Sequence, residues 1–167
     1  VVANDGDIIY LTEGTYFGAV INKEVEIRGN NYNVNPSSTR KNETVFTTDL
    51  IINASNVTIN GVALTETAKF TFDNLSSNVK NINFLYCKVI DSLVNDNYNR
   101  NVAPFNFVSN NDFIISDIFV DYCYINKINN CRPMVMYIVD VENLTVTNSH
   151  FLGGNNRGSY NDAVKID

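Results

Sequence analysis

A spacing of apolar residues recurs along this chain and constrains its fold more than any other feature. Each of four blocks has a first apolar residue and further core-type residues two, five and seven positions later, and the blocks follow one another at intervals of 25, 36 and 26 residues. Two short strands joined by a kink would produce this spacing, because alternate side chains of a strand point to the same side. The return of the block indicates a repeat architecture. The blocks are Val57, Ile59, Val62 and Leu64; Ile82, Phe84, Cys87 and Val89; Ile118, Val120, Cys123 and Ile125; and Leu144, Val146, Ser149 and Phe151.

A residue that favours a bend precedes each block. Asn and Asp tolerate the left-handed backbone region better than other non-glycine residues. We therefore expect a bend that stacks from one repeat to the next at Asn56, Asn81, Asp117 and Asn143. Two looser blocks come earlier: Ile9, Leu11 and Tyr16 with Gly14 at the kink, and Val25, Ile27 and Tyr32 with Asn30 at the kink.

A third short apolar run lies ahead of each of these bends, at residues 50–52, 70–72, 105–107 and 135–139. β-Branched and aromatic residues dominate these runs, and helical periodicity is nearly absent. Three short strands per repeat, without hairpin turn signals, predict an all-β fold. The expected architecture is a right-handed parallel β-helix, a solenoid of about five to six coils. We expect one β-helix domain over residues 1–167.

Two polar segments interrupt the repeat: residues 30–43 (NNYNVNPSSTRKNE) and residues 91–103 (DSLVNDNYNRNVA). We interpret both as loops that leave one corner of the solenoid. Loops on a rigid scaffold often carry function, although tolerated surface insertions would have the same composition. Residues 162–167 (DAVKID) have the pattern of another coil, and the chain does not begin with Met, so we expect a fragment of a longer protein.

The charge and composition argue against several classes of partner. The chain has 12 Lys and Arg against 18 Asp and Glu, a net charge of −6. We expect no nucleic-acid partner, because binding to a phosphate backbone needs a basic surface. We expect no membrane insertion, since the chain lacks a long apolar run. No ligand spacing for a metal is evident, so we expect no cofactor.

Two of the three cysteines occupy the same position in successive blocks. Cys87 and Cys123 should therefore lie on adjacent strands, about 4.8 Å apart. A disulfide is geometrically possible at that separation. Two reduced thiols packed in an apolar ladder are the interpretation that we favour, because free cysteine packs well as a small apolar residue. Cys131 has no evident partner.

A family resemblance supports the expected fold. Residues 6–29 (GDIIYLTEGTYFGAVINKEVEIRG) resemble the first coils of right-handed parallel β-helix proteins of the pectate-lyase-like superfamily. Residues 29–64 (GNNYNVNPSSTRKNETVFTTDLIINASNVTINGVAL) resemble repeat regions of adhesin-like surface proteins. The superfamily includes polysaccharide lyases, polygalacturonases, phage tailspikes and non-catalytic adhesins. The resemblance therefore implies the fold and an extracellular, cell-surface or virion location, but it selects no activity.

The ionisable residues give little support to catalysis. A lyase of that superfamily would need a base, and calcium or a cationic group beside the uronic carboxylate. Calcium needs several converging oxygens, and a polygalacturonase-like hydrolase needs clustered carboxylates. The acids are instead scattered, at Asp91, Asp96, Asp112, Asp117, Asp121 and Asp140. The basic residues look like solvated surface charges: Lys88, Arg100, Lys127, Arg132, Arg157 and Lys165. We assign no catalytic residue, and calcium enters only with the lyase alternative.

Six residues at outward positions of the blocks form the candidate binding site. Tyr86, Tyr122 and Asn148 share one position, and Lys88, Tyr124 and His150 share the position two residues later. We call these six residues the aromatic row. Exposed aromatic side chains among polar ones suit sugar stacking or a protein interface. The alternative is a ladder of tyrosines that stack on one another because tyrosine favours strands.

These features lead to three functional hypotheses. The first is a non-catalytic module of a larger secreted, cell-surface or virion protein, which acts as a rigid scaffold and binds glycans, partner subunits or neighbouring domains. The second is a fragment of a polysaccharide lyase or glycoside hydrolase that acts on an acidic polysaccharide. The third is a subunit of a trimeric phage fibre or spike.

Overall fold

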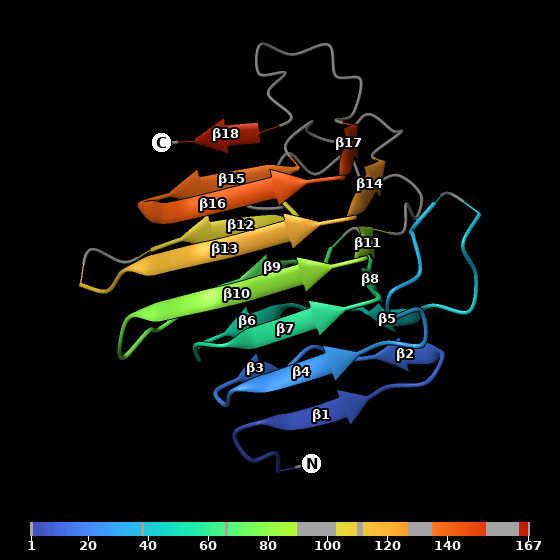
Figure 1. Ribbon diagram of the computed structural model, residues 1–167, viewed down its shortest axis with the longest axis horizontal. Coiled ribbons are helices and arrows are strands. Elements are labelled where there is room, and N and C mark those ends of the chain that lie inside the picture. Colours follow the sequence, from blue (N-terminus) through green and yellow to red (C-terminus); the bar gives the residue numbers. More distant parts are fainter. Residues whose placement is uncertain are drawn as a thin grey trace.

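The computed structural model is all-β and contains three parallel sheets of six strands each (Figure 1). It describes residues 2–37, 39–65, 67–89, 103–109, 112–126, 135–152 and 164–166. Consecutive strands visit the three sheets in turn, so that every third strand belongs to the same sheet. One coil is thus three consecutive strands, one in each sheet. No helix occurs in the part of the chain that the structure describes.

The strands are short, and each pairs in parallel with its equivalents in the neighbouring coils. The first sheet contains β1 (Asp7–Tyr10), β4 (Val25–Arg28), β7 (Val57–Asn60), β10 (Val79–Leu85), β13 (Ile115–Asp121) and β16 (Val141–Thr147). The second contains β2 (Gly14–Tyr16), β5 (Thr44–Phe46), β8 (Val62–Leu64), β11 (Lys88–Val89), β14 (Tyr124–Asn126) and β17 (His150–Leu152). The third contains β3 (Val20–Ile21), β6 (Leu50–Ile52), β9 (Phe70–Thr71), β12 (Phe105–Val108), β15 (Met136–Val139) and β18 (Val164–Ile166).

This topology confirms the all-β class and the three short strands per coil that the repeat predicts, and it is consistent with a parallel β-helix. The third runs appear as β6, β9, β12 and β15. Of residues 162–167, where we expect the start of another coil, the structure describes 164–166, which form β18 and pair with β15. In the part of the chain that the structure describes, no helix has the length and apolar character needed to cross a membrane.

The core lies between the three sheets and consists of the residues that the spacing assigns to it. All twelve positions of the first three blocks are buried. Phe70, Phe84, Phe105 and Phe107 form an aromatic cluster at its centre, with ring centroids as close as 4.8 Å between Phe70 and Phe84. The fourth block is less covered, and Val146 is 40% exposed. Burial of apolar side chains on this scale is the main favourable term in folding.

The predicted bends are confirmed. Asn56, Asn81, Asp117 and Asn143 have φ angles of 57°, 59°, 54° and 55°, in the left-handed region. Asn56 lies directly before a strand of the first sheet, and the other three lie within such strands. The bends stack because the strands that carry them pair in register.

The early block at Val25 is where the spacing fails. The spacing assigns Tyr32 to the second sheet, but residues 30–43 are inserted between β4 and β5. Phe46 occupies that position instead, in register with Tyr16 and Leu64. Tyr32 lies in the inserted segment, 41% exposed, with its ring edge against Tyr10 at 6.1 Å. The second irregular segment, 91–103, lies outside the described residues apart from Ala103.

Candidate binding surface

Three members of the aromatic row lie in register on the second sheet. Lys88 of β11 is opposite Tyr124 of β14, and Tyr124 is opposite His150 of β17. The shared position that the blocks predict is therefore confirmed. The Tyr124 and His150 rings stack, with centroids 5.0 Å apart and planes 10° from parallel.

The other three members of the row occupy a second left-handed bend, between the first and second sheets. Tyr86, Tyr122 and Asn148 have φ angles of 53°, 49° and 46°, and Gly61 holds the equivalent place one coil earlier with φ 72°. The rings of Tyr86 and Tyr122 stack at 5.1 Å with planes 5° apart. A left-handed conformation costs a residue with a Cβ about 1–2 kcal/mol, and glycine or asparagine bears it most easily. Tyrosine at two of the four bends therefore carries a conformational cost that its side chain must offset.

The carboxylate of Asp121 belongs to the same corner. Its Oδ1 accepts hydrogen bonds from Thr147 Oγ1 at 2.7 Å and from Asn148 Nδ2 at 2.9 Å. The backbone oxygen of Asp121 accepts from the N–H of Tyr86 at 3.1 Å. Asp121 thus links successive bends and fixes Asn148 beside the stacked tyrosines.

Lys88 is not at the exposed position that the row predicts. Its residue exposure is 8%, and Ala63, the adjacent outward residue of β8, is fully buried. Lys88 is covered because Arg40 and Glu43 lie against it, a contact that the periodicity of the strands gives no means of predicting. In Figure 1 the segment of residues 30–43, in light blue, rises beside the second sheet. The interpretation of Lys88 as a solvated surface charge is therefore wrong.

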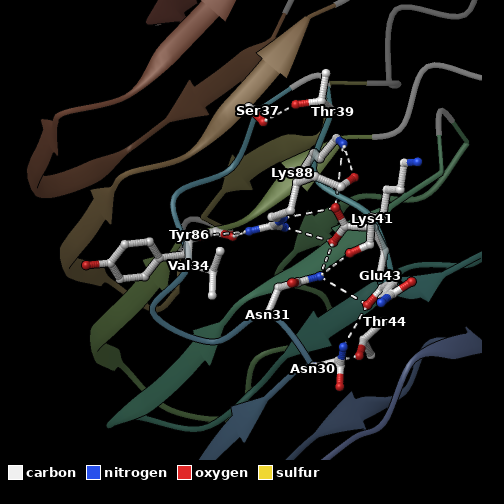
Figure 2. Close-up of polar contacts among 12 residues, drawn as sticks. Asn30, Asn31, Val34, Ser37, Thr39, Lys41, Glu43, Thr44, Tyr86 and Lys88 are labelled. Carbon is white, nitrogen blue, oxygen red and sulfur yellow. Dashed lines mark hydrogen bonds and ion pairs between the residues drawn. The ribbon is translucent and has the colours of Figure 1, made fainter.

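Buried charges hold this segment in place. Arg40 donates from Nε and Nη2 to the two carboxylate oxygens of Glu43, at 2.9 and 3.0 Å, and the two side chains are 4% and 7% exposed. Lys88 Nζ lies 3.5 Å from Glu43 Oε1 and donates to the carbonyl oxygen of Arg40 at 3.2 Å. Figure 2 shows the contacts around Glu43, Lys88 and Tyr86. We call Arg40, Glu43 and Lys88 the charged cluster.

The cluster is hydrogen-bonded on every side that the structure describes. Asn31 Nδ2 reaches Glu43 Oε2 at 3.1 Å and the carbonyl oxygens of Lys41 and Asn42 at 3.0 and 3.1 Å. Asn33 and Asn60 exchange two hydrogen bonds, which attach the segment to the end of β7. No buried side-chain nitrogen or oxygen among the described residues lacks a partner. Buried charges are tolerated only when they are paired in this way.

The surface that remains accessible is aromatic and polar. Tyr86, Tyr122 and Tyr124 are half-buried, and Asn148 and His150 are exposed. The Tyr86 and Tyr122 rings stack on one another, and Tyr124 stacks on His150, so part of each ring face is covered. Such a surface suits hydrogen bonding to a hydroxyl-rich or polar partner. The stacking also fits the ladder interpretation, and the two roles are compatible. The binding role of the row stays a prediction.

Metal-binding and catalytic clusters do not appear among the described residues, where no three His, Cys, Asp or Glu side chains converge. Asp117 and Asp121 take part in bends, and Asp140 has a left-handed φ of 53°. Several candidate ionisable residues lie outside the described residues, as does Cys131: Asp91, Asp96, Arg100, Lys127, Arg132 and Arg157.

Cys87 and Cys123 are both free and buried, and they lie directly before the paired strands β11 and β14. Their thiols donate to backbone carbonyl oxygens, Cys87 to Leu85 and Cys123 to Phe84, each at 3.4 Å. Burial, and after it the hydrogen bond with Cys87, raises the pKa of the Cys123 thiol above its usual value. The Cys123 thiol is therefore protonated at neutral pH, and both thiols are shielded from solvent.

Comparison with protein-family models, with curated proteins and with solved structures finds no match for this chain. The case for a function therefore rests on the residues and their geometry.

Proposed function

We propose that this chain is a right-handed parallel β-helix module of the pectate-lyase-like type, which acts as a rigid scaffold in a secreted, cell-surface or virion protein. Its aromatic row, apart from the buried Lys88, binds a glycan or a partner protein. The stacked coils and the three parallel sheets support the scaffold role, because each strand is held by its equivalents in the neighbouring coils.

The observation that carries the binding role is the placement of Tyr86 and Tyr122 in left-handed bends. Gly61 and Asn148 occupy the equivalent bends at lower conformational cost. Backbone strain of this kind is concentrated at functional sites, where the surrounding structure maintains it. The rings of the two tyrosines form a stack and are half-buried, and tyrosine is enriched in recognition surfaces.

The test is binding to a glycan array by the wild-type chain and by Tyr122→Asn. Asparagine suits the left-handed bend, as Asn148 shows, so the variant removes the ring while the backbone conformation is kept. Tyr10→Asn is the matched control, because Tyr10 is also exposed but lies on β1, outside the row. We expect Tyr122→Asn to lose binding and Tyr10→Asn to retain it, while both variants stay folded as judged by circular dichroism. Binding that survives Tyr122→Asn would contradict the role of the row.

The other hypotheses predict different results. A polysaccharide lyase would release unsaturated products from alginate, pectate or chondroitin, which absorb in the ultraviolet. A fibre or spike subunit would form a stable trimer in solution, which light scattering measures directly. A monomer without lyase or hydrolase activity leaves the binding module as the proposal to pursue.

A further inference from the structure

One side chain of the segment of residues 30–43, that of Arg40, reaches the left-handed bend at Tyr86. Arg40 Nη1 donates to the carbonyl oxygen of Tyr86 at 2.8 Å and to that of Val34 at 2.9 Å. The first of these bonds joins the segment to a left-handed bend that lies 46 residues further along the chain.

The guanidinium of Arg40 is itself fixed. Its other two nitrogens bind both oxygens of Glu43, so the planar group cannot rotate without breaking a bidentate ion pair. Glu43 is held in turn by Asn31 and by Lys88. All three charged side chains are at least nine-tenths buried, where hydrogen bonds to ionised groups are stronger than in water.

The backbone of Tyr86 is therefore held from two directions. Its N–H donates to the carbonyl oxygen of Asp121 in the next coil at 3.1 Å, and its carbonyl oxygen accepts from Arg40. With both peptide groups fixed, the left-handed bend and the direction of the Cα–Cβ bond are fixed too. The Tyr86 ring then lies on the ring of Tyr122.

We propose that Arg40 is a positioning residue for the aromatic row: through its bond to the Tyr86 carbonyl, the segment of residues 30–43 sets the orientation of the Tyr86–Tyr122 stack. As far as a ligand is concerned, this inference rests on the proposed binding function. The orientation of the stack can be measured without a ligand.

The chain contains a matched control for Arg40. Arg28 makes the same bidentate pair with Glu26, from Nε at 2.7 Å and Nη2 at 2.8 Å, and its Nη1 donates to the hydroxyl of Tyr10. That pair is about one-quarter exposed and lies on β4, away from the row. Arg28→Gln thus removes an equivalent set of bonds without touching Tyr86.

The experiment uses Arg40→Gln, Arg40→Lys and Arg28→Gln in the full chain. Arg40→Gln should still fold, because Lys88 remains to pair with Glu43 and leaves one cation for one carboxylate. Arg40→Lys keeps the charge but cannot bind Glu43 and Tyr86 together, and it serves if the glutamine variant does not fold. NMR ring-proton shifts of Tyr86 and Tyr122 report the stack, with Tyr124 and His150 as the internal reference.

We expect both Arg40 variants to move the Tyr86 and Tyr122 shifts toward those of unstacked tyrosine, while Tyr124, His150 and the Arg28→Gln protein stay unchanged. Any glycan that binds the wild type should bind Arg40→Gln about tenfold or more weakly. Unchanged Tyr86 and Tyr122 shifts in a folded Arg40 variant would overturn the inference. If the wild type binds no ligand, the proposed function fails, but the ring shifts still decide the role of Arg40.

Discussion

Asn143 donates a hydrogen bond from Nδ2 to Oδ1 of Asp117, 3.0 Å away in the preceding coil. Asn81 donates in the same way to Asn56 at 2.8 Å, and Asn56 donates to Glu24 Oε2 at 3.0 Å. These side-chain hydrogen bonds join successive bends into a ladder. The ladder is interrupted between Asp117 and Asn81, because a carboxylate accepts hydrogen bonds but has no N–H to donate. Asp117 therefore divides the ladder into two segments.

Asp117→Asn should join the two segments. The new amide can donate to Asn81 and still accept from Asn143. It loses the Oδ2 acceptor of Ser116 Oγ, an exposed bond at 3.2 Å that water can replace. We therefore expect the free energy of unfolding to rise by about 0.5–1 kcal/mol. Urea denaturation measures the change. Glu142→Gln is the control, since it removes one negative charge from an exposed position on the neighbouring strand without touching the ladder. Equal effects of the two substitutions would show that charge, and not the ladder, is responsible.

Gly61→Ala tests how closely residues 30–43 are packed on the coils. A Cβ at Gly61 would lie 2.2 Å from the nitrogen of Tyr32 and 2.3 Å from the carbonyl carbon of Asn31, both of them backbone atoms. Because φ is also positive, we expect a loss of about 2–4 kcal/mol of stability. Gly6→Ala is the control: its φ is +88°, but nothing lies within 4 Å of the new Cβ. It should cost about 1 kcal/mol, and equal losses would argue against the close packing.

The left-handed bend at Tyr122 predicts an order of stability among substitutions. Tyr122→Asn loses the stacking with Tyr86 but adopts the bend readily, whereas Tyr122→Val loses the stacking and carries a β-branched side chain into a forbidden region. We expect the valine variant to be less stable than the asparagine variant by about 1–2 kcal/mol. The midpoints of urea unfolding measure the difference. Equal midpoints would mean that the bend relaxes without cost.

The buried Cys123 thiol predicts a stability that depends on pH. Its pKa is higher in the folded chain than in the unfolded chain, so the unfolded state releases its proton first as the pH rises. The contribution of Cys123 is complete below the usual thiol pKa of about 8.5 and is lost as the pH rises toward the folded value. Cys123→Ser lacks this titration, and Ser149 already occupies the equivalent position one coil later. The stability advantage of the wild type over Cys123→Ser should therefore shrink between about pH 8 and pH 10, whereas a constant difference would contradict the prediction.

The core positions and the bends of the first sheet could be predicted from the sequence, because each depends on a short local pattern of residues. Ile82 and Phe84 alternate along one strand, as Ile118 and Val120 do along the next, and both pairs are buried. The bend at Asn81 carries its own signal in the residue type. Each of these features depends on a few neighbouring residues, which the sequence displays directly.

The exposure of the outward-facing residues could not be predicted so well, because it depends on a contact between segments that are distant in the sequence. Nothing in the periodicity indicates that residues 30–43 fold over Lys88. The opposite charges of Arg40 and Glu43 suggest a local ion pair, but their third partner lies far along the chain. The blocks give Tyr86 and Tyr122 a shared position, and their rings stack, yet the left-handed bend of Tyr86 has no signal in a tyrosine.

The charged cluster also affects the order in which the coils unfold. In a repeat array each unit normally contacts its immediate neighbours, so opening can start at an end and proceed one unit at a time. Arg40 and Glu43 belong to the coil of β4 and β5, whereas Lys88 and Tyr86 belong to the coil of β10 and β11. The cluster therefore connects these two coils directly, across the intervening coil of β7 and β8. Fraying from the amino-terminal side is expected to halt there, so that these three coils unfold as a single cooperative unit.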